Sequence, residues 1–337
     1  MADVFNGWKK ALQNLGVTVA AYNTHDRLIF YSKALIDTEE TDETGHPIVR
    51  QAMSQEQAIL ASVQGLTHAL YTFWPDVVLC VSAFFMQAGI LQLAHERHKL
   101  VLLHTESPYQ DEEQLDRAQF AHLNLLNDPV NISRYDEMGI PALYMPHAFD
   151  PDVHYPRTGP RDPARASDFA FVGTAFRSRI EFFERMNFQG IDAVIGGSDW
   201  DKLDEDSPLR KLLGHDPEEC VDNTEAAELY RHAKCGINVY RNETEEQHNG
   251  AGWAIGPREV EMAACELFYL RDPRGEGDGL FPMLPTFDGP EDAGKQLRWW
   301  LAHDRERENA AAAARKAIAG RTFDASARRL LALLGNL

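Results

Sequence analysis

Short apolar runs separated by amphipathic segments recur along this chain, and they constrain its fold more than any other feature. Continuous apolar runs of this length are typical of strands buried on both faces of a parallel sheet. Because the segments between them have helical spacing, the pattern predicts an α/β fold with two similar domains of the nucleotide-binding type, facing each other across a cleft. The runs lie within residues 74–82, 99–107, 122–129 and 142–150 of the first half and 168–179, 191–200, 235–241 and 267–270 of the second.

A segment rich in proline and arginine, residues 151–167, separates the two halves. Because 337 residues is long for one core, we interpret this segment as the start of a second domain. The predicted domains cover residues 1–150 and 151–322. Residues 323–337 are predicted to form a C-terminal helix, for which packing back on the first domain is one arrangement.

The N-terminus departs from the usual order of elements. Residues 4–15 have helical spacing, and the strand-like VTVAAY follows at residues 17–22. A doubly wound domain normally begins with a strand instead. The first domain is therefore expected either to lack its first strand or to be truncated at its start.

The charge balance and the cysteines exclude several classes of protein. Lys and Arg total 33 against 52 Asp and Glu, a formal net charge of −19, which disfavours general binding to nucleic acid or anionic membranes but not a local phosphate pocket. The four cysteines are far apart and have no metal-binding spacing. No apolar run approaches the roughly 20 residues that span a bilayer, and the N-terminus has no signal-peptide pattern. These features favour a soluble cytoplasmic protein.

The stretch Gly250–Asp272 has the pattern of an anion site. A glycine-rich loop leads to Pro257, a favourable first residue of a helix, and the next turn carries Arg258, Glu259 and Glu261. Backbone N–H groups at a helix start attract phosphate, and an arginine binds two oxygens at once. An ordinary capped connection between a strand and a helix explains the same pattern.

Polar residues follow several predicted strands of the first half. His104 and Glu106 come at the end of the run 99–107, and His25, Asp26 and His147 follow other strand-like segments. Open α/β sheets bind their ligands at the carboxyl ends of the strands. These five residues are therefore candidates for the acceptor side of a cleft.

An ordered series of motifs resembles the CgeB-like group of GT-B glycosyltransferases, known from spore-maturation proteins and from phage and bacterial genomes. The resemblance covers most of residues 70–325 and is strongest in the second half. The motifs are YMPHAFDPDVH, DFAFVGTAFRSR, ELYRHAKCGINVYR, GPREVEMAAC, WWLAHDRER and RTF.

The resemblance implies two Rossmann-like domains, with a nucleotide-sugar donor held mainly by the second and an acceptor by the first. It implies no metal and no cofactor, because protein groups neutralise the leaving diphosphate. Arg258 matches the family's arginine before the donor helix and Glu261 its glutamate, for which Glu259 is an alternative. The donor-binding candidates are Gly173, Thr174, Arg179, Asn238, Tyr240, Arg241, Gly256, Arg258, Glu259 and Glu261, with Arg177 as an alternative to Arg179.

One residue departs from the family's motif. Glu266 stands after the Ala-Cys pair, where the family usually has glycine. This substitution leaves the local course of the backbone open.

We therefore hypothesise a glycosyltransferase that moves a hexosyl or pentosyl group to a virion protein, a modified nucleic-acid base or another glycan. The catalytic candidates are Arg258 for the diphosphate and Glu106 or His104 as the base for the acceptor. Two other functions stay open: a nucleotide-sugar 2-epimerase, and a non-catalytic GT-B remnant that acts as a binding module. The donor, the stereochemical course and the oligomeric state do not follow from the sequence. A phage-encoded protein would act in the host cytoplasm.

Overall fold

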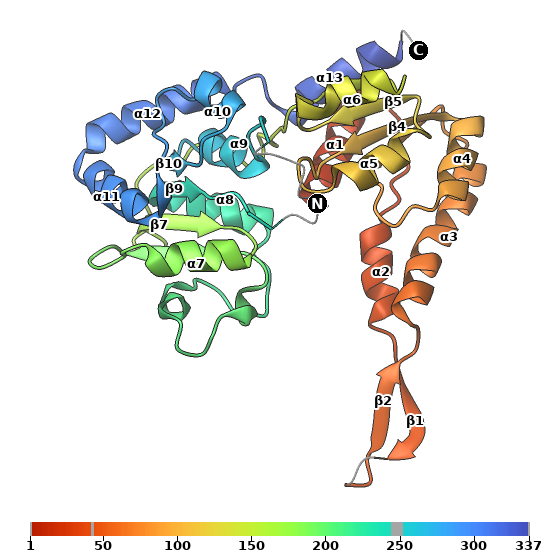
Figure 1. The fold of residues 1–337 in the computed structure, drawn as a ribbon, viewed down its shortest axis with the longest axis horizontal. Coiled ribbons are helices and arrows are strands. Elements are labelled where there is room, and N and C mark those ends of the chain that lie inside the picture. The colour runs from red at the N-terminus through yellow and green to blue at the C-terminus, as the bar shows by residue number, and fades with distance from the viewer. Residues whose placement is uncertain (1, 42–43, 244–251, 336–337) are drawn as a thin grey trace.

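The computed structural model describes residues 2–41, 44–243 and 252–335, and within them it contains two four-stranded parallel sheets and one two-stranded hairpin. The two sheets and their helices form separate bodies side by side (Figure 1). This architecture confirms the predicted α/β fold with two Rossmann-like domains.

The first sheet has the strand order β3-β4-β5-β6. Its strands are β3 (Val77–Val81), β4 (Lys99–His104), β5 (Leu123–Leu126) and β6 (Ala142–Tyr144). The helices that follow or precede them are α3 (Gln55–Phe73), α4 (Ala88–Arg97), α5 (Asp111–Ala118) and α6 (Ile132–Glu137), with the short η1 (Pro129–Asn131). Each of the four predicted apolar runs of the first half contains one of these strands.

The second sheet has the order β10-β9-β7-β8. Its strands are β7 (Ser167–Val172), β8 (Ala193–Gly196), β9 (Ala233–Asn238) and β10 (Phe268–Arg271). The surrounding helices are α7 (Arg177–Arg185), η2 (Trp200–Lys202), η3 (Pro208–Leu212), α8 (Asn223–His232), α9 (Pro257–Ala264), α10 (Gly275–Leu280), α11 (Gly289–Ala302) and α12 (Asp304–Ala317).

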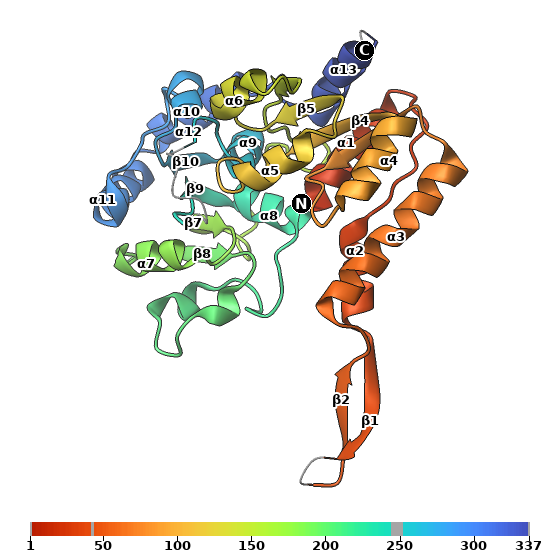
Figure 2. The ribbon, with the colours of Figure 1, turned by 45° about the vertical axis from the view of Figure 1, so that its right-hand side comes forward.

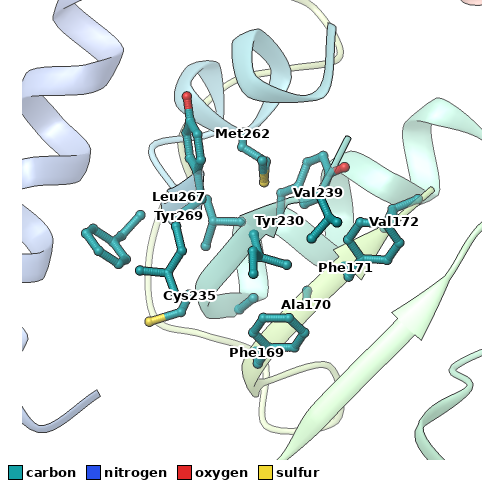
Figure 3. Packing of buried hydrophobic residues seen from close by; sticks show 14 of the residues in the cluster. Phe169, Ala170, Phe171, Val172, Tyr230, Cys235, Val239, Met262, Leu267 and Tyr269 are labelled. Carbon is teal, nitrogen blue, oxygen red and sulfur yellow. The ribbon is translucent and has the colours of Figure 1, made fainter. Parts of the chain in front are cut away.

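Aromatic and aliphatic side chains fill the core of the second sheet. Phe169 and Phe171 of β7 belong to one buried cluster with Tyr230 of α8 and Met262 of α9 (Figure 3). Phe171 also packs tilted against Phe183 of α7, with ring centroids 4.6 Å apart. Burial on both faces explains why these strands are continuous apolar runs.

The first and last described helices share one face of the first sheet. Trp8 of α1 (Ala2–Asn14) and Phe323 of α13 (Phe323–Leu334) pack with Val101 and Leu103 of β4. The alternate residues of β4, such as Leu102, belong to a second cluster under α4. The chain thus returns to the first sheet after completing the second.

The prediction of a strand at residues 17–22 was wrong. This segment is extended between α1 and α2 (Thr24–Ser32) but pairs with no strand in the part of the chain that the structure describes. Its anchor is a side chain, since Tyr22 Oη donates to the carbonyl of Ser62 at 2.9 Å. An alternating pattern makes a strand only where a sheet edge is free to pair with it.

An arm projects from the first domain. It consists of α2, the antiparallel pair β1 (Leu35–Thr41) and β2 (Pro47–Gln51), and the start of α3. Figures 1 and 2 show the hairpin extending away from both sheets. The acidic, turn-rich sequence of this region therefore lies outside the two cores.

Replacement of Gly7 tests the packing of α1 on α13. A Cβ at Gly7 would lie 2.3 Å from the ring of Phe323, whereas a Cβ at Gly89 of α4 would meet nothing within 4 Å. Gly7→Ala is expected to destabilise the protein by about 1–3 kcal/mol, because the buried ring must move. The matched control Gly89→Ala should stabilise it by up to about 1 kcal/mol through helix propensity. Urea unfolding measures both, and equal stabilisation by the two changes would contradict the described packing.

Candidate active site

A cleft lies between the two domains, where strands of both sheets end. It encloses about 1060 Å³, counting the part that opens to solvent. The loop after β4 and Asn127 after β5 line it from the first domain, and the turn after β7, the end of β9 and the start of α9 line it from the second. The carboxyl ends of parallel strands are the usual ligand sites of such sheets.

Ten of the residues singled out from the sequence line this cleft. They are Glu106, His147, Gly173, Thr174, Arg179, Asn238, Tyr240, Arg241, Gly256 and Arg258. The structure therefore brings the donor-side and acceptor-side candidates together at one place, although they are up to about 150 positions apart in the chain.

At the turn after β7, the packing leaves no room for a side chain at Gly173 or at the neighbouring Gly197. A Cβ on Gly173 would lie 2.9 Å from the ring of Phe171, and one on Gly197 would lie 2.1 Å from the carbonyl oxygen of Gly173. Trp200 Nε1 donates to that same carbonyl at 3.0 Å. The backbone of this turn is thus fixed and exposed to the cleft through Gly173 and Thr174.

Arg179 reaches the cleft from α7 without an acidic partner among the described residues. Its Nε donates to the carbonyl of Val239 at 2.8 Å and its Nη1 to that of Thr174 at 3.1 Å. Burial lowers the pKa of this guanidinium to about 10, so it stays charged at neutral pH. The strand end at residue 239 and the turn at residue 174 therefore orient one positive charge beside Gly173.

The loop that leads into α9 has its amides occupied by side chains. The N–H groups of Trp253 and Ala254 donate to Asp128 Oδ2 at 2.8 and 2.9 Å, and that of Ile255 donates to Glu276 Oε2 at 2.8 Å. Both carboxylates are buried. The sequence predicted that amides of this region bind a ligand phosphate, but here the protein's own carboxylates take that place.

Glu259 completes this arrangement at the start of α9. The N–H of Gly256 donates to Tyr240 Oη at 2.9 Å and to Glu259 Oε2 at 3.0 Å, and Tyr240 Oη also bonds to Glu259. Glu259 is fully buried, and burial raises its pKa to about 7. Its carboxylate therefore caps the helix beneath the cleft rather than facing it.

Arg258 and Glu261 lie together on the next turn. Arg258 Nη1 donates to Glu261 Oε2 at 2.9 Å and to Asn223 Oδ1 at 3.3 Å. Glu261 and Asn223 line a smaller cavity that adjoins the cleft and shares His147 and Pro257 with it. Glu259 and Glu261, which the sequence left as alternatives, thus occupy different environments.

Glu106 faces the second domain across the cleft. Its Oε2 lies 3.4 Å from Arg241 Nη2. Burial raises the pKa of this carboxyl, and the positive charge of Arg241 opposes that shift. The pair joins the loop after β4 to the end of β9.

His104 and His147 are both held neutral. His104 is buried, its Nε2 lies 2.8 Å from Asn124 Oδ1, and burial lowers its pKa to about 4. Burial likewise lowers the pKa of His147 to about 4. His104 lines the smaller cavity and not the main cleft.

His25 and Asp26 do not lie at the cleft. They stand in the first turn of α2, where Asn23 Oδ1 accepts from their N–H groups at 3.0 and 3.3 Å. Because residues 17–22 form no strand, the residues that follow are not at the carboxyl edge of a sheet. Their placement as strand-end residues was therefore wrong.

Several polar and aromatic lining residues were missed from the sequence. They include Tyr109, Asn127, Phe176 and Arg274. Asn127 directly follows β5, and Arg274 lies three residues after β10. A search of every predicted strand end would have found these two.

Glu266 follows the backbone course of the glycine it replaces. Its φ is +57°, in the left-handed region that favours glycine. The N–H of Glu266 donates to the carbonyl of Ala263 and that of Leu267 to Met262, both at 3.0 Å, which is the Schellman arrangement at a helix end. The departure from the family's motif therefore leaves the end of α9 intact.

Within residues 2–41, 44–243 and 252–335, no group of three or more His, Cys, Asp or Glu side chains is placed to hold a metal ion. No helix in the same ranges is long and apolar enough to cross a membrane.

The pKa of Glu259 gives a pH test of the loop. Because this pKa is about 7 in the folded protein and 4.5 ordinarily, its contribution to stability is complete below pH 4.5 and is lost as the pH rises through 7. Glu259→Gln, which resembles the protonated form, should flatten the fall in Tm between pH 5 and pH 8. Glu306→Gln, on the exposed face of α12, should show the same change of Tm with pH as the wild type. Parallel curves for Glu259→Gln and the wild type would show that Glu259 is ionised throughout.

Part of the chain matches a known protein family. The family described as glycosyl transferase-like matches residues 177–332. No curated protein matches the chain.

Solved structures share the architecture at low sequence identity. A sucrose-phosphate synthase from Thermosynechococcus elongatus is 13% identical, with a TM-score of 0.58 over 88% of this chain and 84% of that one. A glycosyltransferase from Rickettsia africae is 12% identical, with a TM-score of 0.58 over 98% and 93%. An Anabaena protein solved with UDP-glucose is 11% identical, with a TM-score of 0.55 over 82% of both chains. The chain thus has the GT-B fold of these structures, and its residues 177–332 match the glycosyl transferase-like family.

Proposed function

We propose that this protein transfers a sugar from a nucleotide-diphosphate sugar to an acceptor, with the donor on the second domain and the acceptor on the first. One observation carries the proposal. Arginines of the second domain and the carboxylate of Glu106 from the first face the same cleft at the carboxyl ends of both sheets. The Anabaena structure with UDP-glucose and an E. coli structure named for trehalose-6-phosphate and bound with UDP-2-fluoro glucose support a nucleotide-sugar donor. The motif series supports the CgeB-like group as the subfamily.

The donor diphosphate is assigned to side chains beside the turn after β7. Glycosyl transfer passes through an oxocarbenium-like state, and the leaving diphosphate needs fixed positive charge. Arg179 lies beside Gly173, and Arg258 lines the same cleft from α9. Asn238 adds a buried Nδ2 that has no hydrogen-bond partner among the described residues. These groups supply positive charge and a donor without requiring a metal ion.

Glu106 is the proposed base for the acceptor hydroxyl. A raised pKa brings a carboxylate closer to the range in which general bases work well at neutral pH. His104 is the weaker candidate, because a pKa of about 4 leaves little affinity for a proton and its Nε2 already bonds to Asn124. Glu261, in the adjoining cavity, is proposed to bind hydroxyl groups of the donor.

An epimerase is the second candidate. A putative UDP-N-acetylglucosamine 2-epimerase from Listeria monocytogenes has a TM-score of 0.56 and 13% identity over 85% of this chain and 80% of that one. An epimerase converts the nucleotide sugar with no acceptor present. Product analysis with a panel of nucleotide sugars alone separates the two, since a transferase releases the nucleoside diphosphate and an epimerase produces a new nucleotide sugar.

Arg258→Ala tests the donor assignment. Loss of one preorganised positive group at a leaving diphosphate is expected to lower donor turnover by about 10²- to 10³-fold. Arg177→Ala is the matched control, because Arg177 belongs to the exposed side of α7 and pairs with Glu181. Its turnover should equal that of the wild type. Full activity of a folded Arg258→Ala protein, with folding checked by circular dichroism and urea unfolding, would overturn the assignment.

A further inference from the structure

Arginines and aromatic rings alternate across the cleft. The Arg241 guanidinium lies 4.9 Å from the ring centroid of Phe176 and 4.1 Å from that of Tyr109. The Arg274 guanidinium lies 4.0 Å from the ring of Tyr240, and its Nη2 is 3.5 Å from Tyr109 Oη. Two arginines of the second domain therefore flank one tyrosine of the first.

Arg274 is nine-tenths buried without an ion pair. It is 7% exposed, and its Nη1 has no hydrogen-bond partner in the part of the chain that the structure describes. The charge of Arg274 acts on the carboxyl groups of Asp272 and Glu259 without a salt bridge, and these groups accept instead from the N–H of Tyr240 at 2.7 Å and from that of Gly256 at 3.0 Å. An unpaired buried guanidinium is costly, so a charge of this kind that lines a cleft indicates an anionic ligand.

The stacked arrangement keeps the arginine donors available. Contact with a ring face orients a guanidinium without using its N–H groups, which then bind oxyanions in a fork. Arg241 directs one of its N–H groups at Glu106, with Nη2 lying 3.4 Å from Oε2. Arg274 Nη1 is buried beside Gly252 and has no hydrogen-bond partner among the described residues.

This arginine pair stands on the first-domain side of the cleft. Arg241 contacts Glu106 and Tyr109, and Arg274 contacts Tyr109. Arg179, in contrast, is bonded to the carbonyls of Thr174 and Val239 in the second domain. The two sets of arginines are thus suited to different parts of a bound pair of substrates.

We propose that the acceptor carries an oxyanion, a phosphate or a carboxylate, which binds between Arg241 and Arg274. This inference rests on the proposed transferase function, because only that function places an acceptor beside Glu106. A chain with net charge −19 repels anions at long range, so an anionic acceptor needs such a local site.

The experiment uses the full chain saturated with a nucleoside diphosphate, so that the donor diphosphate site is filled. Calorimetry first selects the nucleotide from UDP, GDP, ADP, CDP and dTDP. Inorganic phosphate and, separately, acetate are then titrated into the complex. We expect one of the two anions to bind with a Kd on the order of millimolar, and Arg274→Gln to weaken that binding at least 10-fold while changing nucleotide affinity less than 3-fold. Arg177→Gln should change neither affinity.

Each other outcome contradicts a specific statement. Failure of every nucleotide to bind would overturn the proposed function and this inference with it. Nucleotide binding without binding of either anion would overturn this inference alone. Equal loss of nucleotide and anion in Arg274→Gln would assign Arg274 to the donor. If Arg274→Gln does not fold, Arg241→Gln replaces it, because its side chain is about one-fifth exposed, and the same anion should then bind at least 3-fold more weakly.

Discussion

The cleft depends on one loop, residues 253–256, whose backbone amides are bound by buried carboxylates. Asp128 from the first domain holds two of them, and Glu276 and Glu259 from the second hold the others. Glu276 also accepts from Tyr144 Oη at 2.7 Å and pairs with Arg321, which precedes α13. Asp128 and Glu276 therefore fix the loop before α9 and also join the two domains. Removal of either would leave buried amides unpaired, which is costly.

This arrangement determines which groups of the second domain are left to bind the proposed donor diphosphate. A loop whose amides are already bonded cannot offer them to a phosphate, so the positive charge must come from side chains. Four arginines that line the cleft meet that need: Arg179 lies beside Gly173, Arg258 belongs to α9, and Arg241 and Arg274 contact Glu106 and Tyr109 of the first domain. The rings of Phe176, Tyr109 and Tyr240 hold several of these guanidinium groups without neutralising them. A diphosphate donor and an anionic acceptor would therefore bind to different arginines.

The sequence predicted the parts of this fold that depend on local pattern. Strands such as β4 and β7 are buried on both faces, so their composition alone identified them. The prediction of a strand at residues 17–22 was wrong because the pattern of residues does not show whether a sheet edge is free to pair with the segment. The bonding of the loop amides could not be predicted, because Asp128 lies more than 120 positions from the amides it binds. Arg274 was not predicted as a site residue because it follows β10 in a segment that has no motif of its own.

A crystal structure of the protein with a bound nucleoside diphosphate tests the central claim most directly. The account predicts diphosphate oxygens within hydrogen-bond distance of Arg179 or Arg258 beside Gly173, with the amides of residues 253–256 still bonded to Asp128, Glu276 and Glu259. A diphosphate bound to those amides, or outside the cleft, would contradict it.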